Sequence, residues 1–330
     1  MKKILFAAMA VLAITSCSQN EEFEGGQGQN SVIKVGSIVK KSPRATILDN
    51  DHFTSFKVTS YIVDPSQDYS TTGLGSAYMN GVGYEKTANV WAQTGTAKDY
   101  YWPIESKNVQ FFGYPADMTL TDAATGFPTL SFTVADASAD QTDLVVAALK
   151  TAKTGDGSVN LPFQHILTRV NFAYKVTNVT DFTYTIKGIE IVGVEGGTAK
   201  YTYGTLADKS NRGSWANASK VDATYAYPFA TPTTPSIDDY VSLQSTNGSL
   251  MLLPQTIPAD AKIRVTYSAI NKDNANIGFD GTKEVALTGT WSVGQNICYQ
   301  LTLPTGAEKI TVTGSASEWD AEEPTGAPFN

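Results

Sequence analysis

The side chains that could act as an acid, a base or a nucleophile are few in this sequence. It contains two histidines, His52 and His165, and no serine stands in a Gly-x-Ser-x-Gly motif. Acidic residues do cluster, at Asp238 and Asp239 and again in residues 318–323. A glycosidase needs two carboxylates held across a sugar, and nothing in the sequence indicates such a pair. We therefore interpret these acids as solvated surface groups, and we predict that the protein has no catalytic residue and is not an enzyme.

Cofactor, metal and nucleic-acid sites are not indicated either. The glycine turn Gly81-Val82-Gly83 lies within a stretch that predicts strand, whereas a phosphate-binding loop opens a helix. Two cysteines, Cys17 and Cys298, are too few for a cysteine-ligated metal cluster, and we interpret Cys298 as a packed free thiol. The net charge of −8 argues against a surface that neutralises phosphates. We expect no cofactor, no metal ion and no nucleic-acid partner.

The first residues have the features of an export signal. Lys2 and Lys3 precede an apolar run, residues 4–14, that is too short to span a membrane. The run ends in Ile14-Thr15-Ser16-Cys17, which resembles the lipobox of bacterial lipoproteins. By that resemblance residues 1–16 are a signal peptide, and Cys17 carries the lipid, palmitate included, that attaches the protein to the outer membrane. The alternative is an ordinary secretory signal beside an incidental cysteine.

The segment behind Cys17 ends in a candidate processing site. Residues 18–30 are polar and glycine-rich, as in a flexible tether, and residues 32–39 predict a strand. The basic loop Lys40-Lys41-Ser42-Pro43-Arg44-Ala45-Thr46 follows, and an exposed arginine in such a loop suits a trypsin-like protease. We therefore expect cleavage between Arg44 and Ala45, with residues 17–44 as a lipid-tethered linker and propeptide strand. The alternative is that Arg44 is an ordinary surface residue of an uncleaved lipoprotein.

Alternation of apolar and polar residues predicts an all-β protein, and residues 166–176 show it best. The face that we expect to be buried consists of Ile166, Val170, Phe172, Tyr174 and Val176. On the other face we expect Arg169 and Lys175 to be more exposed. His165, beside this strand, is interpreted as a structural hydrogen-bonding residue.

The length of 330 residues suits two domains. Many short strands separated by turn residues indicate two β-sandwiches in tandem. We predict an N-terminal sandwich over residues 45–157 and a C-terminal sandwich over residues 158–330, joined near residues 155–160, with residues 166–176 opening the second. Residues 143–149 fit either a helix or a buried strand.

Several aromatic groups could stack on sugars. They are Tyr100-Tyr101-Trp102, Phe111-Phe112 and Tyr225-Ala226-Tyr227. Packing inside a sheet is the more common use of such residues. If they were exposed on one face, the protein would instead be a lipid-anchored glycan-binding protein of an outer-membrane uptake system.

A set of short motifs, in order along the chain, resembles the fimbrillin family of Bacteroidetes surface proteins. The motifs are Pro43-Arg44-Ala45-Thr46, Tyr101-Trp102-Pro103, Val109-Gln110-Phe111-Phe112-Gly113-Tyr114-Pro115, Asp143-Leu144-Val145-Val146-Ala147, Phe163-Gln164-His165-Ile166-Leu167-Thr168-Arg169-Val170-Asn171-Phe172, Leu252-Leu253-Pro254-Gln255 and Trp291-Ser292-Val293-Gly294-Gln295. They cover nearly all of the chain behind the signal peptide. Each motif is weak alone, and the ordered set is fairly specific.

The resemblance implies two transthyretin-like β-sandwich domains in a structural subunit of a fimbria (pilus), or in a related adhesion protein on the cell surface. It also implies that a protease removes an N-terminal strand at an arginine, for which Arg44 is the match, and that a strand from the next subunit fills the groove. Other fimbrial subunits would then be the partners, beside receptors on host or bacterial surfaces. The last residues, 321–330, carry no clear mark of a donor strand.

Overall fold

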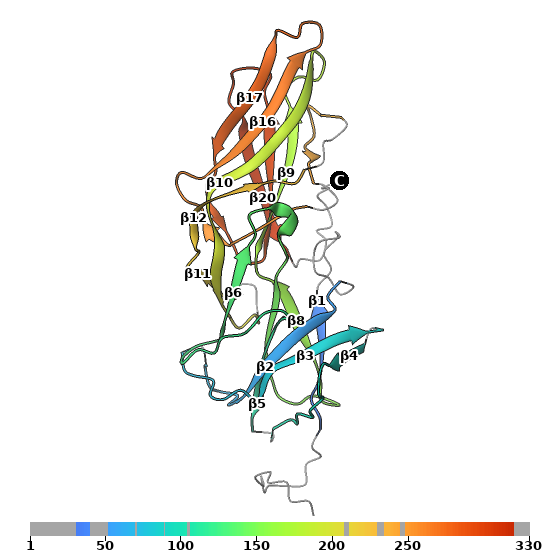
Figure 1. The fold of residues 1–330 in the computed structure, drawn as a ribbon, viewed down its shortest axis with the longest axis vertical. Helices are drawn as coiled ribbons and strands as arrows, with labels where there is room; N and C mark the ends of the chain where they lie inside the picture. The colour runs from blue at the N-terminus through green and yellow to red at the C-terminus, as the bar shows by residue number, and fades with distance from the viewer. Residues whose placement is uncertain are drawn as a thin grey trace, which may run out of the picture. The chain divides into compact units, whose positions relative to one another are not determined.

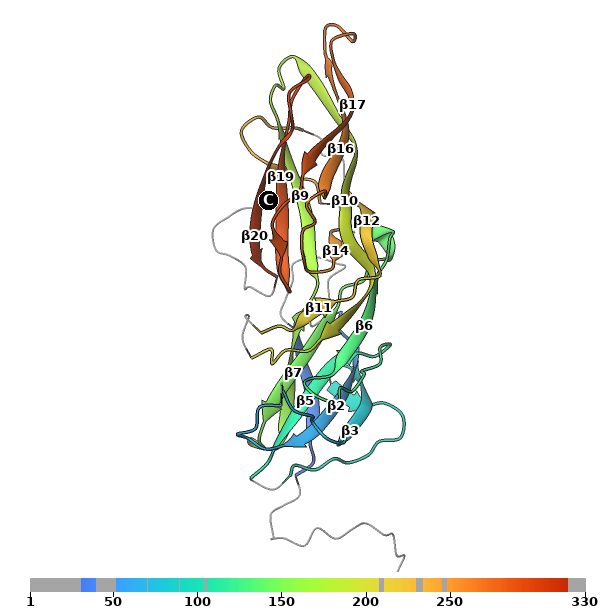
Figure 2. The same ribbon diagram turned by 90° about the vertical axis from the view of Figure 1, so that its left-hand side faces the viewer.

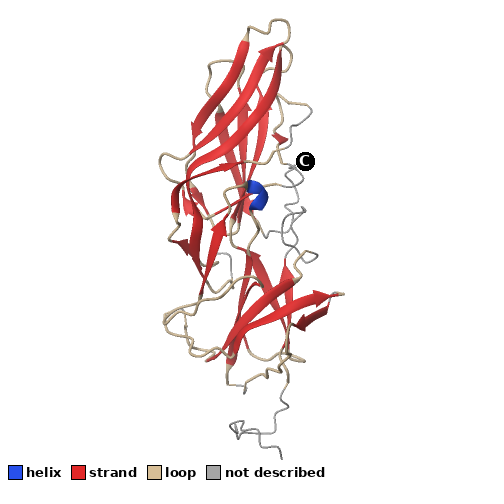
Figure 3. Cartoon of the chain, viewed as in Figure 1, coloured by secondary structure: helices blue, strands red, loops and turns tan. Residues whose placement is uncertain are grey.

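The computed structural model describes residues 31–39, 52–69, 71–88, 90–103, 106–207, 211–229, 234–244 and 248–319. The regular structure of these residues is β-strand, apart from the short 3-10 helix η1, Ser138–Asp140 (Figure 3). The all-β class predicted from the alternation is therefore confirmed. Among the described residues, no helix is long and apolar enough to cross a membrane.

A seven-stranded sheet, in the order β1-β8-β7-β5-β2-β3-β4, contains the N-terminal strands (Figure 1). Its strands are β1 (Lys34–Val39), β2 (Ser55–Val63), β3 (Met79–Thr87), β4 (Val90–Gln93), β5 (Asn108–Pro115), β7 (Val145–Thr151) and β8 (Ser158–His165). Neighbouring strands are antiparallel, except that β1 runs parallel to β8. Residues 143–149, for which the sequence allowed helix or strand, lead into β7, a strand that starts with four buried apolar residues.

The second sheet is built on the 21-residue strand β10 (Phe182–Thr202). Its other strands are β6 (Thr129–Val134), β11 (Ser214–Ala216), β12 (Lys220–Ala226), β16 (Lys262–Asn271) and β17 (Gly278–Ala286). The register of β10 shifts beside Gly188 and again beside Gly193, whose φ of +79° suits glycine. These irregularities accompany the change of partner along β10, which pairs with β16 in its first half and with β6 in its second.

A third sheet faces the second one (Figure 2). It has the order β13-β9-β19-β20 with β14 also beside β9, and its strands are β9 (Thr168–Val176), β13 (Val241–Ser242), β14 (Leu250–Leu252), β19 (Gln295–Leu303) and β20 (Thr311–Glu318). A small separate pair joins β15 (Gln255–Thr256) to β18 (Thr290–Trp291). Cys298 on β19 is buried as a free thiol, as expected, and burial raises its pKa to about 11.

Apolar side chains form two clusters. The smaller one is formed mainly by side chains of the seven-stranded sheet and contains Phe56, Phe111 and Phe163. The larger one contains Phe172 from β9 and Val265 from β16, so the second and third sheets pack face to face on it. It also takes in side chains from β2, β5 and β7 of the seven-stranded sheet.

The division into two domains at residue 157 stays a prediction. β8 begins just after that point and pairs with β7 and β1, which belong to the seven-stranded sheet. β6, which precedes it, pairs with β10 of the second sheet. Strand pairing therefore crosses the predicted boundary in both directions.

The exposure predicted for β9 is correct for one face and wrong for part of the other. The expected apolar face is buried, but Arg169 is only 5% exposed and Asn171 only 8%. Arg169 Nε donates to Ser249 Oγ at 2.9 Å, and Ser249 Oγ donates to Asn171 Oδ1 at 2.6 Å. Side chains from distant segments therefore cover this face, and alternation along β9 alone cannot reveal them. Lys175 is half-buried, with its ammonium 4.9 Å from the Tyr240 ring centroid.

Gly113 in β5 is required by close packing. A Cβ at this position would lie 2.6 Å from Cζ of Phe163 and 3.3 Å from Cβ of Ala147. The Phe163 ring is fully buried, with its centroid 4.6 Å from that of Phe53 and 5.1 Å from that of Phe56, so it has no room to retreat. The glycine of the sequence motif Phe111-Phe112-Gly113-Tyr114 thus lets β8 lie against β5.

We predict that Gly113→Ala lowers the free energy of unfolding by about 1–3 kcal/mol, because the added methyl overpacks this contact. Urea unfolding measures the change. Gly188→Ala is the matched control, since a Cβ there would meet only Cβ of Thr266 at 3.9 Å. An equal loss of stability in the two variants would show that the Phe163 contact does not require glycine.

Candidate functional site

The predicted lipidation and cleavage positions, Cys17, Arg44 and Ala45, lie outside the described residues. The strand predicted between them is described and is β1. This strand is the candidate functional element, because it is the last described structure before the expected cleavage site. Its position decides what its removal would expose.

β1 is an edge strand of the seven-stranded sheet and pairs in parallel with β8, from Lys34 opposite Ser158 to Val39 opposite Phe163 (Figure 1). Two parallel strands need a long connection, and here the partners stand more than a hundred residues apart in the sequence. No local motif therefore indicates this pairing, which explains why the sequence placed β8 in a different domain from β1.

The residues just before β1, 31–33, have a second partner on the side away from β8. Ile33 N donates to Tyr100 O at 2.7 Å, and Trp102 N donates to Ser31 O at 3.1 Å. Trp102 Nε1 donates to Gly157 O at 2.9 Å, which ties this second partner to the turn before β8. Residues 31–39 thus lie along β8, with residues 100–102 on the other side of their first part, and we call this position the groove.

Three apolar side chains of this segment fill the interior side of the groove. Ile33, Val35 and Val39 are 2%, 5% and 1% exposed, and they belong to the same cluster as Phe56 and Phe163. Full burial of one such side chain stabilises the folded state by about 1.5–3 kcal/mol relative to leaving it exposed. Ile38, by contrast, points outward and is 50% exposed. The groove therefore accepts apolar residues at three positions, spaced by two and then by four residues.

Trp91 of β4 borders the groove from the opposite edge of the sheet. A Cβ on Gly36 would lie 3.4 Å from Cδ1 of Trp91, so the two edge strands β1 and β4 lie close together. The Trp91 ring packs edge-on against Phe56, with centroids 4.6 Å apart. Loss of β1 would expose the backbone edge of β8 together with part of this aromatic core. An open edge beside an apolar surface readily pairs with another strand.

His165 has the structural role expected from the sequence. Its Nδ1 lies 3.0 Å from Asp143 Oδ2, and both side chains are 1% exposed. Its ring stacks on Trp319, with centroids 4.3 Å apart and planes 1° from parallel. The group joins the end of β8, the approach to β7 and the end of β20.

The acidic clusters do not form a paired site among the described residues. Asp238 and Asp239 are exposed, and Ser236 Oγ accepts hydrogen bonds from both of their backbone amides. Glu318 accepts from Arg212 Nη2 at 3.0 Å. An open surface pocket contains Asp117 together with Asp143, but the Asp143 carboxylate is buried against His165. The described part of this pocket does not present the two accessible carboxylates of a glycosidase.

Most of the aromatic residues that could have stacked on sugars are core residues. Trp102, Phe111, Phe112, Tyr225 and Tyr227 are all buried. Tyr101 is 39% exposed and Tyr100 is half-buried. The aromatic face that would favour a glycan-binding protein is therefore largely missing from the described surface.

Comparison with known proteins identifies relatives of one kind. The family model for fimbrillin-like proteins matches residues 44–319. The fimbrium subunit Fim1C of Phocaeicola vulgatus is 26% identical, with 96% of this chain and 96% of that protein covered. A fimbrial protein from Bacteroides vulgatus has a similar fold, with a TM-score of 0.66 at 19% identity over 88% of this chain and all of that one. A protein from Bacteroides ovatus that is provisionally named a cell adhesion protein also has a similar fold. Its TM-score is 0.53 at 15% identity, over 90% of this chain and all of that one.

We predict that Val35→Asp lowers the free energy of unfolding by about 2–4 kcal/mol, because it places a carboxylate in the apolar groove. Ile38→Asp introduces the same side chain three residues away on the outward face, and its effect should stay within about 0.5 kcal/mol. Urea unfolding measures the stabilities of the two variants. Hydrogen exchange of the β8 amides shows whether β1 is still paired with β8. Equal effects of the two substitutions would contradict the assignment of the inward face.

Proposed function

The chain belongs to the fimbrillin-like family, and we propose that it is a structural subunit of a cell-surface fimbria that joins its neighbours by strand exchange after removal of β1. Its relatives are fimbrial and adhesion proteins, and this family is structural rather than enzymatic. The observation that carries the strand-exchange proposal is the seating of β1, which fills a groove of the folded sheet but precedes the residues matched by the family model.

The contacts of β1 are of a kind that another chain can supply. The described contacts of residues 31–39 include backbone hydrogen bonds to β8 and to residues 100–102, and apolar side chains in three positions. Strand addition uses these same two elements, with backbone bonds giving affinity and side-chain positions giving specificity. A strand of a neighbouring subunit can therefore replace β1 without rearrangement of the sheet.

Cleavage at Arg44 supplies the reason for exchange. In the intact chain, the link from β1 to β2 keeps β1 at a high effective concentration beside its groove. After cleavage β1 is a separate peptide, and its release becomes possible. The edge of β8 and the apolar positions are then available to a strand held nearby by another subunit.

Attachment to the cell follows from the same arrangement. In this proposal Cys17 is acylated and anchors the uncleaved protein in the outer membrane, with the folded sheets outside the cell. Because Cys17 and β1 lie on the same side of Arg44, cleavage separates the subunit from its lipid. A polymerised subunit then depends on its neighbours for attachment, whereas an anchor subunit would resist cleavage and keep its lipid. Receptors on host or bacterial surfaces are the remaining proposed partners.

We predict that an arginine-specific protease makes the protein competent for strand uptake by cutting after Arg44. A fluorescent peptide with the sequence of residues 31–39 should bind the cut protein, as measured by fluorescence polarisation, and should not bind the uncut protein. Size-exclusion chromatography with mass spectrometry would identify the cut site and any oligomers.

Arg44→Lys is the matched control, because it keeps the positive charge and resists this protease. A second control is the peptide with Val35→Asp, which keeps the length but should not fit the groove. If the wild-type chain is cut at Arg44, releases β1 and then neither oligomerises nor takes up the peptide, strand exchange is wrong.

We further predict that Cys17→Ser abolishes incorporation of labelled palmitate in growing cells and leaves an unprocessed precursor. Cys298→Ser is the control, because that thiol is buried within the sheet and should not affect labelling. Persistent labelling of the Cys17 variant would contradict the assignment of the lipid.

A further inference from the structure

β17 presents a second long strand edge. It pairs with β16 along nine residue positions and lies at the end of its sheet, so among the described strands β16 is its only partner. Edges of this length are templates for pairing with another chain. The two faces of β17 show what such a pairing would meet.

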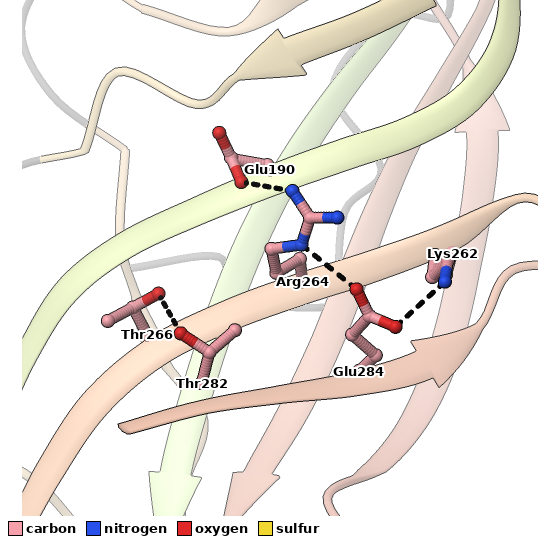
Figure 4. Close-up of polar contacts among 6 residues, drawn as sticks. All are labelled: Glu190, Lys262, Arg264, Thr266, Thr282 and Glu284. Carbon is pink, nitrogen blue, oxygen red and sulfur yellow. Dashed lines mark hydrogen bonds and ion pairs between the residues drawn. The ribbon is translucent and has the colours of Figure 1, made fainter. Parts of the chain in front are cut away.

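The outward face carries a polar ladder (Figure 4). Arg264 donates to Glu190 at 3.1 Å and to Glu284 at 3.0 Å, and Lys262 donates to Glu284 at 2.8 Å. Thr266 and Thr282 hydroxyls lie 2.9 Å apart beside them. The two cations lower the pKa of the Glu284 carboxyl. These four charges balance one another, so this face is internally satisfied.

The β16 residues paired with the inward face of β17 are apolar and buried, so an apolar inward face is expected on β17 as well. Gly281 stands opposite Tyr267, Lys283 opposite Val265 and Val285 opposite Ile263, and these three partners on β16 are fully buried. Cross-strand partners share a face, so Lys283 points toward the core side of the sheet. Inward-pointing charges on edge strands are one means by which natural proteins prevent pairing between edges.

Lys283 contacts the loop between β19 and β20 in the opposing sheet. Its ammonium donates to the carbonyl oxygens of Gly306 and Glu308, and it lies 4.4 Å from the Phe279 ring centroid and 6.0 Å from that of Tyr267. Burial lowers the pKa of Lys283, while the Glu308 carboxylate opposes that shift. The side chain is half-buried, so the charge sits where the two sheets open to solvent at their edge.

We propose that Lys283 prevents β17 from pairing with the β17 of a second copy of this chain. A strand added to this edge would extend the sheet over the opening and cover the ammonium, and covering a charge that keeps only part of its hydrogen bonds is unfavourable. This inference does not depend on the exchange of β1, because it concerns a different edge.

The sequence of β17 explains why a second copy is the relevant partner. In an antiparallel pair centred on Thr282, Gly281 of one copy faces residue 283 of the other, and Phe279 faces Val285. With an apolar residue at 283, both copies would present a continuous apolar inward face, and the side chain at 283 would lie over a glycine. With Lys283 in both copies, the paired strands would instead bury two ammonium groups on the apolar side of the interface.

The test is the association state of Lys283→Met, which keeps the length of the side chain and removes its charge. Sedimentation equilibrium of the purified chain should show a dimer dissociation constant lower by roughly tenfold or more than that of the wild type. Hydrogen exchange should show protection gained over residues 278–286 in the associated form. Lys262→Met is the matched control, because it removes one charge from the outward face next to the same edge and should not change the association.

Lys283→Arg, which keeps a cation, should stay as monomeric as the wild type. Should Lys283→Met fail to fold, by near-ultraviolet circular dichroism, Lys283→Gln provides the uncharged variant for the same comparison. A folded, uncharged variant that associates no more than the wild type would overturn the proposal. Association without protection of residues 278–286 would overturn it as well, because the contact would then lie elsewhere.

Discussion

The parallel pairing of β1 with β8 is the interaction on which the proposed biology depends. It joins residues more than a hundred positions apart, and it closes the apolar cluster of the seven-stranded sheet on one side. Among the described residues, backbone hydrogen bonds and three buried aliphatic side chains of residues 31–39 hold this segment in the groove. Such an attachment is stable while the chain is continuous, since the loop-closure entropy is small compared with the burial. In our proposal, it becomes exchangeable once the chain is cut at Arg44.

Two of the sheet edges in the described structure deal with the exposure of strand backbone in different ways. At the β8 edge, β1 covers the apolar positions and pairs with the backbone, and in our proposal this strand leaves after cleavage. At the β17 edge, a half-buried lysine occupies the core-side face and binds carbonyls of the opposite sheet. In our proposals, the first arrangement allows one strand to replace another, and the second disfavours pairing with a second copy of the chain. Protection of the β17 edge would benefit a protein that assembles through another edge, because exposed strand edges are templates for aggregation.

A buried polar group fixes the end of the last described strand. Trp319 stacks on His165, and the guanidinium carbon of Arg169 lies 6.0 Å from the Trp319 ring centroid. Trp319 N donates to Gly294 O at 2.9 Å, and Arg212 Nη1 donates to the same oxygen at 3.3 Å. Polar groups are costly to bury unless they are paired, so these contacts specify one position for β20 relative to β8 and β9. This explains why residues that look like a solvated strand face are instead buried.

The local order of the chain was determined by the sequence alone. The sequence indicated a strand before Arg44. Alternation revealed the apolar face of residues 166–176 and the all-β class, because side-chain period is a property of neighbouring residues. The ordered motifs also pointed to the correct family. Tertiary structure alone decided the partners of each strand: that β1 lies beside β8, that Arg169 is covered, and that Lys283 faces the core side. The physical reason is that strand pairing and the covering of a face depend on segments far apart in the chain, and the spacing of residues within one segment carries no record of them.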